Sequence, residues 1–255
     1  MRWLNMDKNT YSATDVAVII PAHSWPQYLP EALDSIQSQS VTPAVTICVL
    51  DGPADSREYE AILKRYPGTM EVWLLSNQGP SAARNAGAQA ASLAGLKWMV
   101  FLDEDDLLHP RFLEKMLLSR QICPDRAIHY CDWVKFGRWD GYQRTPEYTF
   151  DRLLAGPFIM STSLIKVEAW ENVRDHNGFG FDPDLRGWED WMFFLEAGAL
   201  GHYGARVGLG LCRYRKHASS ISSTAHANLP HIVAYIKDAM HKRYGVEVTY
   251  EVPNV

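Results

Sequence analysis

The sequence is short of cysteine and of net positive charge. Its four cysteines are far apart and none belongs to a Cys-x-x-Cys pair, which argues against a disulfide scaffold, a zinc site or a redox motif. The 25 Lys and Arg residues are outnumbered by 30 Asp and Glu residues, so the formal net charge is −5. That balance disfavours a protein held mainly by nucleic-acid phosphates or by an anionic membrane surface.

Long apolar runs and two common phosphate-binding loops are missing too. No apolar run approaches the ~20 residues of a membrane-spanning helix, and residues 1–15 lack the apolar core of a secretion signal. We therefore expect a cytoplasmic protein without a transmembrane segment, and attachment to the membrane periphery stays open. The sequence has neither a GxGxxG loop after a strand nor a GxxxxGKS/T loop, which disfavours dinucleotide dehydrogenases and P-loop enzymes.

What is present has the composition of an ordinary globular protein, 47% hydrophobic and 22% charged. Helical patterns at about 28–39, 56–66 and 79–94 separate short, unbroken apolar runs, which are typical of strands buried on both faces. These runs are residues 16–20, 45–50, 71–75 and 98–102. The alternation predicts an α/β fold with a mostly parallel central sheet, helices on both faces, and ligands beyond the C-terminal strand ends.

After Pro110 the regular alternation stops. We predict one domain over residues 1–255, and the patterns that follow Pro110 divide it further. These patterns are a helix at 111–121, a strand at 127–136, a long irregular region at 137–187, a helix at 189–199, a short strand at 209–214 and a helix at 228–243 packed on the domain. The parts are a nucleotide-binding half at about 15–110, a second half at about 111–225, and a C-terminal helix and tail at 226–255.

Four adjacent acids, Asp103, Glu104, Asp105 and Asp106, follow the fourth apolar run directly. Neighbouring carboxylates repel one another and raise each other's pKa values, so a cation is expected to offset them. Carboxylate oxygens suit Mg²⁺ or Mn²⁺, which bind through few carboxylates plus substrate phosphates. Acids also suit the first turn of a helix, and the residues alone do not separate the two interpretations.

Other polar groups follow the second and third apolar runs. Asp51-Gly52 is either a turn or a ligand contact at a strand end. Arg84 lies in the small-residue segment QGPSAARNAG, where a helix N-terminus and a guanidinium suit a phosphate.

Two further motifs lie in the second half. GWEDW, residues 187–191, places two acids between two tryptophans at a helix start, which suits either the helix dipole or a sugar-binding face with a base. RYRKH, residues 213–217, is a cationic run in an acidic protein, and is either a solvated face or an anion site with a metal-binding histidine.

The order of these segments resembles the inverting glycosyltransferases of family 2, which have a GT-A fold. The resemblance covers roughly residues 15–222 and rests on VAVIIPAHSWPQYLPEALDSIQSQ, VLDG, NQGPSAARNAGA, FLDEDD, GWEDW and YRKHASSIS. It implies a metal-dependent transfer of a sugar from a nucleoside diphosphate, with UDP expected, to a hydroxyl of a carbohydrate or glycoconjugate. Polysaccharide or glycoconjugate synthesis is the implied setting, and no nucleic-acid partner is expected.

The resemblance also implies roles for individual residues. On the donor side, the nucleotide-sugar contacts are Pro21, Ala22, His23, Asp51, Arg84, Asp103 and Glu104. The ligands of Mn²⁺ or Mg²⁺ are Asp105, Asp103 and His217. On the acceptor side, Asp190 is the catalytic base, and the sugar wall is formed by Trp188, Glu189 and Trp133. Trp191, which lies further inside the helix, is expected in the core.

Two other functions compete with transfer. A sugar-nucleotide nucleotidyltransferase also uses an α/β nucleotide fold and carboxylate-bound metal, but the sequence has no N-terminal glycine-rich loop with Arg and Lys, and that function leaves GWEDW unexplained. A non-catalytic carbohydrate-binding protein on the same fold predicts loss of the acids, and all of them are present.

Overall fold

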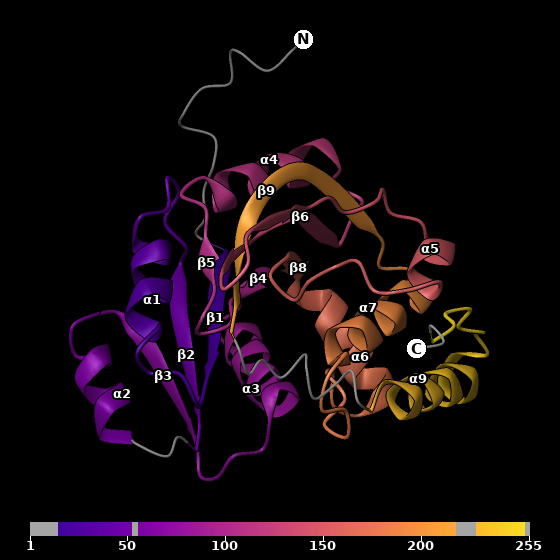
Figure 1. Ribbon diagram of the computed structural model, residues 1–255, viewed down its shortest axis with the longest axis horizontal. Helices are drawn as coiled ribbons and strands as arrows, with labels where there is room; N and C mark the ends of the chain where they lie inside the picture. The colour runs from indigo at the N-terminus through magenta and orange to yellow at the C-terminus, as the bar shows by residue number, and fades with distance from the viewer. Residues whose placement is uncertain (1–14, 53–55, 218–227, 253–255) are drawn as a thin grey trace.

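The computed structural model describes residues 15–52, 56–217 and 228–252 (Figure 1). Its first half is a parallel sheet in the order β3-β2-β1-β4. The strands are β1 (Val16–Ala22), β2 (Val45–Asp51), β3 (Thr69–Leu74) and β4 (Trp98–Phe101). All four predicted strands are therefore confirmed, and their C-terminal ends lie at one edge of the sheet, because they run parallel. The expected burial on both faces was wrong for β3, which lies at the end of the sheet and is partly exposed.

Helices cover both faces of this sheet, as the sequence predicted. Alternate residues of β1 point to opposite faces, so Val18 joins one hydrophobic core and Ile19 the other. The Val18 face is covered by α1 (Leu29–Gln37), α2 (Ser56–Leu63) and α4 (Phe112–Ile122). The Ile19 face is covered by α3 (Pro80–Leu93), which approaches closely because a Cβ on Gly87 would lie 2.3 Å from Ile19 Cγ2.

The sheet continues beyond β4 in the order β8-β6-β9-β5, with β7 paired to β6. The added strands are β5 (Leu107–Leu108), β6 (Ile128–Gly137), β7 (Gly141–Gln143), β8 (Leu164–Lys166) and β9 (Gly204–Lys216). β4 and β6 both run antiparallel to β8, and β6 runs parallel to β9. The β6–β9 register shifts at Asp132, and β9 arches across the top of the molecule in Figure 1.

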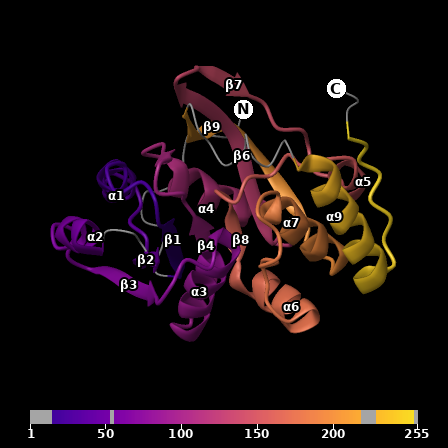
Figure 2. The ribbon, with the colours of Figure 1, turned by 60° about the horizontal axis from the view of Figure 1, so that its bottom comes forward.

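The prediction of an irregular region at 137–187 was wrong. It contains β7, β8, α5 (Phe150–Leu154) and the eleven-residue helix α6 (Val167–Asn177). Three features hid them: β7 and β8 are three residues each, α5 is five, and α6 buries only four of its residues among polar neighbours. Figure 2 shows α3, α6, α7 (Glu189–Ala199) and α9 (Leu229–Tyr244) side by side, and all four share one hydrophobic core.

The C-terminal helix α9 packs on the rest of the protein as predicted, with Leu229, Val233, Ile236 and Met240 buried. None of the helices in the described ranges has the length and apolar character that a membrane span requires.

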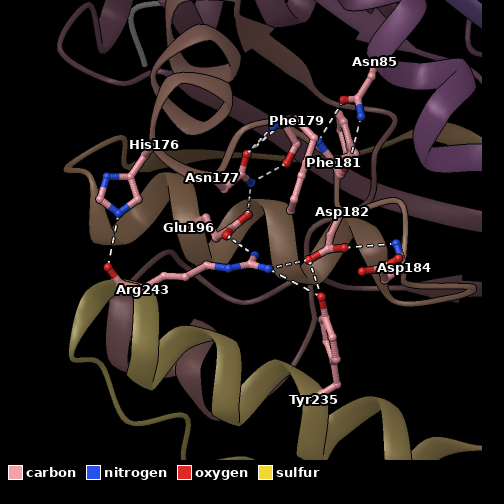
Figure 3. A network of polar contacts seen from close by, with 11 residues as sticks. Asn85, His176, Asn177, Phe179, Phe181, Asp182, Asp184, Glu196, Tyr235 and Arg243 are labelled. Carbon is pink, nitrogen blue, oxygen red and sulfur yellow. Dashed lines mark hydrogen bonds and ion pairs between the residues drawn. The ribbon is translucent and has the colours of Figure 1, made fainter.

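A buried ion cluster ties α9 to two other segments (Figure 3). The guanidinium of Arg243 donates to Glu196 of α7 at 2.9 Å and to Asp182 at 3.0 Å, and both acids are fully buried. The hydroxyl of Tyr235 donates to Asp182 at 2.9 Å, and the amide of Asn177 donates to Glu196 at 2.8 Å. Two side chains of α9 therefore hold Asp182, which lies in the loop between α6 and α7.

Candidate active site

Arg84 lies between two of the acidic motifs of the sequence and is buried, with 5% of its surface exposed. Its Nη1 donates to Glu189 Oε1 at 2.6 Å, and its Nη2 donates to Asp103 Oδ1 at 2.8 Å. Arg84 belongs to α3, Glu189 begins α7, and Asp103 follows β4. One guanidinium thus joins three segments that are far apart in the sequence, and the charge-assisted bonds fix their relative positions.

Asp190 follows Glu189 but makes a different set of contacts. Burial and the charge of Glu189 raise the pKa of Asp190 to about 7, although Arg84 acts in the opposite direction. Its Oδ1 accepts a hydrogen bond of 2.8 Å from the Trp191 backbone N–H. The Asp190 side chain lines a pocket of about 400 Å³ together with Trp133, Trp188 and other residues. A carboxyl group that changes protonation near neutral pH, in a pocket, is suited to accept a proton.

Trp188 gives the chain its turn into α7. Its φ of 62° lies in the left-handed region, and it is the one residue besides glycine with a positive φ in the described part of the chain. Such a conformation costs about 1–3 kcal/mol and persists only where the surroundings enforce it. Here the Trp188 ring packs edge-on against Trp191 and Tyr250, with ring centres 5.5 and 5.6 Å apart. Trp191 is 1% exposed, as expected for a core residue.

The loops after β1 and β2 are joined through His23 and Asp51. His23 Nδ1 lies 2.7 Å from the Asp51 carbonyl oxygen, and His23 Nε2 lies 2.8 Å from Asn77 Nδ2. The Asp51 carboxylate accepts hydrogen bonds of 2.8 Å from the backbone N–H groups of Gln78 and Gly79. Three predicted strand ends therefore converge, and both oxygens of Asp51 are engaged in shaping the loop that opens α3.

Arg186 lies over the same loop, and the sequence analysis did not identify it. A Cβ on Gly79, whose φ is 94°, would lie 2.2 Å from Arg186 Nη1. Glycine is required there both by the backbone conformation and by the guanidinium that covers it. The exposed Arg186 thus adds a positive charge beside the N-terminus of α3. The spacing of Arg186 from Gly79, over a hundred residues, gave no local signal.

Glu104 is turned toward the interior of the protein. It is 6% exposed, and its Oε1 accepts hydrogen bonds from the backbone N–H groups of residues 23–25 at 2.9–3.0 Å. Its Oε2 accepts a 2.7 Å hydrogen bond from the Tyr59 hydroxyl. Burial raises the pKa of Glu104, and the four donors oppose that shift. Both oxygens hold the loop after β1, so this side chain acts on the site through that loop.

Asp105 and His217 meet on the other side of the acidic cluster. Asp105 Oδ2 lies 2.7 Å from His217 Nε2, and the His217 ring stacks on Trp25 with centres 4.9 Å apart. Burial and the charge of Asp103 raise the pKa of Asp105, and His217 opposes that shift. Behind this pair, Asp106 is completely buried and accepts a 2.8 Å hydrogen bond from the Arg215 backbone N–H. Asp106 therefore fastens β9 to the turn after β4.

Comparison with known protein families gives a match over most of the chain. A profile of the family described as "Glycosyl transferase family 2" matches residues 17–182. The chain belongs to glycosyl transferase family 2. The match covers the loops of His23, Asp51, Arg84 and the acidic cluster, and it ends before Asp190.

Relatives of this family-2 chain include an uncharacterized glycosyltransferase of Haemophilus influenzae, 25% identical over 88% of this chain and 76% of the relative. Chondroitin synthase of Pasteurella multocida is 24% identical over 77% of this chain and 20% of its own length. The chain spans 76% of the Haemophilus protein but less than two thirds of the length of four other curated relatives, chondroitin synthase among them.

Solved structures confirm the GT-A fold. The structure of S. aureus TarS 1-349 in complex with UDP-GlcNAc has a TM-score of 0.73 and 17% identity over 90% of this chain and 67% of that chain. The complex of the same protein with UDP has a TM-score of 0.70 and 16% identity over 90% of this chain and 66% of that chain.

The residues of the family-2 site fit a divalent cation. Asp105 and His217 bring an oxygen and a nitrogen donor together in a largely buried position, with Asp103 beside them. Across the described ranges, no group of three or more His, Cys, Asp or Glu side chains is placed to hold a metal ion, so the protein ligands here number two at most. An open set of this kind suits Mn²⁺ or Mg²⁺, which take few protein ligands and complete their coordination with phosphate oxygens.

The structure brings most of the predicted site residues to one edge of the sheet, in two groups. The pocket group consists of Trp133, Trp188 and Asp190. The other group is formed around the strand ends by Pro21, Ala22, His23, Asp51, Arg84, Asp103, Glu104, Asp105, Glu189 and His217. Glu189 contacts Arg84 and does not line the pocket, so it links the two groups.

Proposed function

We propose that this chain is a metal-dependent inverting glycosyltransferase, working as a single GT-A-like domain, that transfers a sugar from a UDP-sugar to a hydroxyl of a carbohydrate or glycoconjugate. The observation that carries the proposal is the Asp190 carboxyl group. Its pKa of about 7 and its position on a pocket, one residue from the Arg84-linked Glu189, suit a general base at neutral pH. Polysaccharide or glycoconjugate synthesis is the setting that we infer.

The donor nucleotide is placed at the loops of His23 and Asp51 in this proposal. Support comes from the three strand ends that meet there and from the exposed guanidinium of Arg186 beside them. In open α/β sheets, ligands bind beyond the C-terminal ends of the strands. UDP is our choice of nucleotide because TarS, which shares the fold, has structures in complex with UDP and UDP-GlcNAc.

Asp105 and His217 would hold Mn²⁺ or Mg²⁺, with Asp103 nearby. The bound cation supplies positive charge that stabilises a departing diphosphate. Arg84 keeps Asp103 and Glu189 in fixed positions, because both ion pairs are short and the guanidinium is buried. Glu104 holds the loop after β1 and so supports the nucleotide contacts of His23.

The transfer itself is a single displacement. An acceptor hydroxyl attacks the anomeric carbon from the face opposite the diphosphate, while Asp190 takes the hydroxyl proton. The new carbon–oxygen bond forms as the bond to the diphosphate oxygen breaks, and that oxygen keeps the electron pair. One displacement inverts the anomeric centre, so an α-linked donor gives a β-linked product.

The test is a donor panel with purified protein. UDP-, GDP- and dTDP-sugars are incubated with Mn²⁺, and free nucleoside diphosphate is measured for the wild type, Asp105→Ala and Asp190→Asn. We expect release of UDP that requires Mn²⁺ and is lost in both variants. Release that is equal without metal and in Asp105→Ala would contradict the metal role. Formation of UDP-sugar from UTP and a sugar 1-phosphate, with pyrophosphate as product, would favour the nucleotidyltransferase alternative.

A further inference from the structure

One wall of the Asp190 pocket is built by the hairpin of β6 and β7. Trp133 and Gln143 are paired across these two strands, and both line the pocket. Arg144 follows Gln143 and lines the pocket as well. The remaining lining side chains are mainly apolar, with Phe158, Met160 and Trp188 among them. Arg144 is therefore a cation in a pocket whose other walls suit the apolar faces of sugars.

Lys135 and Lys216 carry the same charge onto the neighbouring surface. The Lys135 ammonium lies 5.2 Å from the centre of the Trp133 ring, and the Lys216 ammonium lies 4.2 Å from the centre of the Tyr214 ring. The two rings pack edge-on with centres 5.6 Å apart. Both lysines therefore lie on one pair of packed rings, Trp133 and Tyr214, and Trp133 also lines the pocket. Cation–π contacts hold the lysines there.

In the part of the chain that the structure describes, these cations have no acidic partner, in contrast to the nearby Arg206 and Arg215. Among the residues that the structure describes, neither lysine nor Arg144 forms an ion pair with a carboxylate. Arg144 also lines an adjoining hollow of about 420 Å³. Arg206, on the wall of that hollow, is neutralised by Asp132 at 2.9 Å and Glu147 at 3.1 Å.

Unpaired cations beside a catalytic pocket, in a chain with net charge −5, favour an anionic ligand. We propose that the acceptor is an anionic glycan or glycoconjugate whose carboxylate or phosphate group binds Lys135 and Arg144 while its hydroxyl lies at Asp190. This inference rests on the proposed function, because it takes the Asp190 pocket as the acceptor site. Trp133 and Trp188 contact the sugar rings, and the cations select the charge.

Binding of defined probes at low ionic strength tests the proposal. The probes are tetragalacturonate, which carries carboxylates, a four-unit oligo(glycerol phosphate), which carries phosphodiesters, and maltotetraose, which is neutral. Calorimetry compares the wild type with Lys135→Gln, Arg144→Gln and the double variant. Lys64→Gln is the matched control, because Lys64 is exposed at the end of α2, away from the pocket.

We expect at least one anionic probe to bind more tightly than maltotetraose, and each single substitution to weaken that binding by roughly tenfold, the usual effect of losing one charged hydrogen bond. Raised salt should weaken it as well. Which anionic probe binds distinguishes carboxylate from phosphate. The affinity for UDP with Mn²⁺ should be unchanged in both variants.

Three results would overturn the inference. One is equal affinity for the neutral and the anionic probes, and another is an equal loss in Lys64→Gln. The third is weaker UDP binding in Lys135→Gln and Arg144→Gln, which would assign these cations to the donor diphosphate. Release of UDP from a UDP-sugar by the wild type is measured separately, so a failure of this inference is distinguishable from a failure of the proposed function.

Discussion

Two arginines, the buried Arg84 and the half-buried Arg243, each join two carboxylates from separate segments, but their surroundings differ. Around Arg243, both acids are fully buried and their oxygens are bound by side chains of α9 and α6 (Figure 3). Around Arg84, the side chain of Asp103 is 35% exposed. The Nε of Arg84 is buried with no hydrogen-bond partner in the described part of the chain.

The difference is that the Arg84 cluster has three carboxyl groups, whereas the Arg243 cluster has two. Arg84 forms ion pairs with Asp103 and Glu189, while Asp190 faces the pocket with a raised pKa. The ion pairs therefore stabilise the fold around Arg243, where both carboxyl groups are paired. Around Arg84, a third carboxyl group, which forms no ion pair within the described ranges, lies beside a pocket and is available for reaction. The two clusters are also connected, because α7 carries Glu189 and Asp190 at its start and Glu196 two turns later.

Breaking the Arg243 cluster, which is closed because both of its acids are fully buried and paired, should have the largest effect on stability. Arg243→Met leaves two fully buried acids without their cation, and removal of one partner of a buried ion pair costs about 3–5 kcal/mol of unfolding free energy. Urea denaturation and melting curves measure it. The matched control is Lys242→Met, an exposed neighbour in the same helix, for which we expect a change within about 0.5 kcal/mol. An equal, small loss in both variants would contradict a closed cluster.

Removing Asp190, the third acid of the Arg84 cluster, should lower the activity and not the stability. Asp190→Asn keeps the size of the side chain but cannot accept the acceptor's proton, so transfer should fall at least ~10²-fold. The melting temperature should be kept or raised, because a buried charge is removed without breaking an ion pair. Glu189→Gln is the comparison, since it removes the negative charge that pairs with Arg84 at 2.6 Å and should also lose stability. Transfer by Asp190→Asn at the wild-type single-turnover rate would reject the base assignment.

The pH dependence tests Asp190 directly. Burial also raises the pKa of Glu196 in the Arg243 cluster to about 7, but Glu196 is the same in the wild type and in Asp190→Asn. Because the folded-state pKa of Asp190 is raised to about 7, the ionised base is scarce at acid pH. Transfer should therefore rise about tenfold per pH unit below 7 and level off above it. The raised pKa also means that the protonated carboxyl favours the folded state below about pH 4, and that this contribution is lost as pH rises through 7.

The wild type should accordingly lose stability relative to Asp190→Asn between about pH 4 and 7. Melting curves of the two proteins at pH 5 and pH 8 measure this difference. A transfer profile with its midpoint near the ordinary carboxyl value of ~4 would show that the buried position of Asp190 does not set its ionisation.

The comparison also shows what the sequence was able to predict. The parallel strands were predictable because each is a short segment rich in β-branched, aromatic and other apolar residues, and most of β1 and β2 is buried. The acids at strand ends were predictable because Asp51 and Asp103 follow such runs directly. Topology then brings the strand ends together, so these motifs form one site.

Other features depend on contacts between distant segments and had no local signal. The bond between Arg84 and Glu189 spans 105 positions, and the Arg243 cluster joins α9 to residues 47 and 61 positions away. Among four adjacent acids, the sequence did not show which one turns inward. The structure shows Glu104 bound to the loop after β1 and Asp106 bound to β9.

The smallest effect that we expect is on nucleotide binding at the loops beside the Arg84 cluster. Both oxygens of Asp51 accept backbone hydrogen bonds, from Gln78 and Gly79. Asp51→Asn can accept only one of them, and its amide group would face the other N–H, so the loop that opens α3 should shift beneath Arg186. We expect UDP to bind roughly tenfold more weakly, the effect of one lost charge-assisted bond.

Calorimetry with UDP and Mn²⁺ measures this change, and a melting curve shows whether the fold is kept. The matched control is Asp175→Asn, the same chemical change on an exposed side chain of α6, which should leave UDP affinity unchanged. If Asp51→Asn lowers the melting temperature while the folded protein binds UDP as the wild type does, Asp51 only shapes a turn. In that case the nucleotide does not depend on the N-terminus of α3, and Arg186 becomes the next residue to substitute.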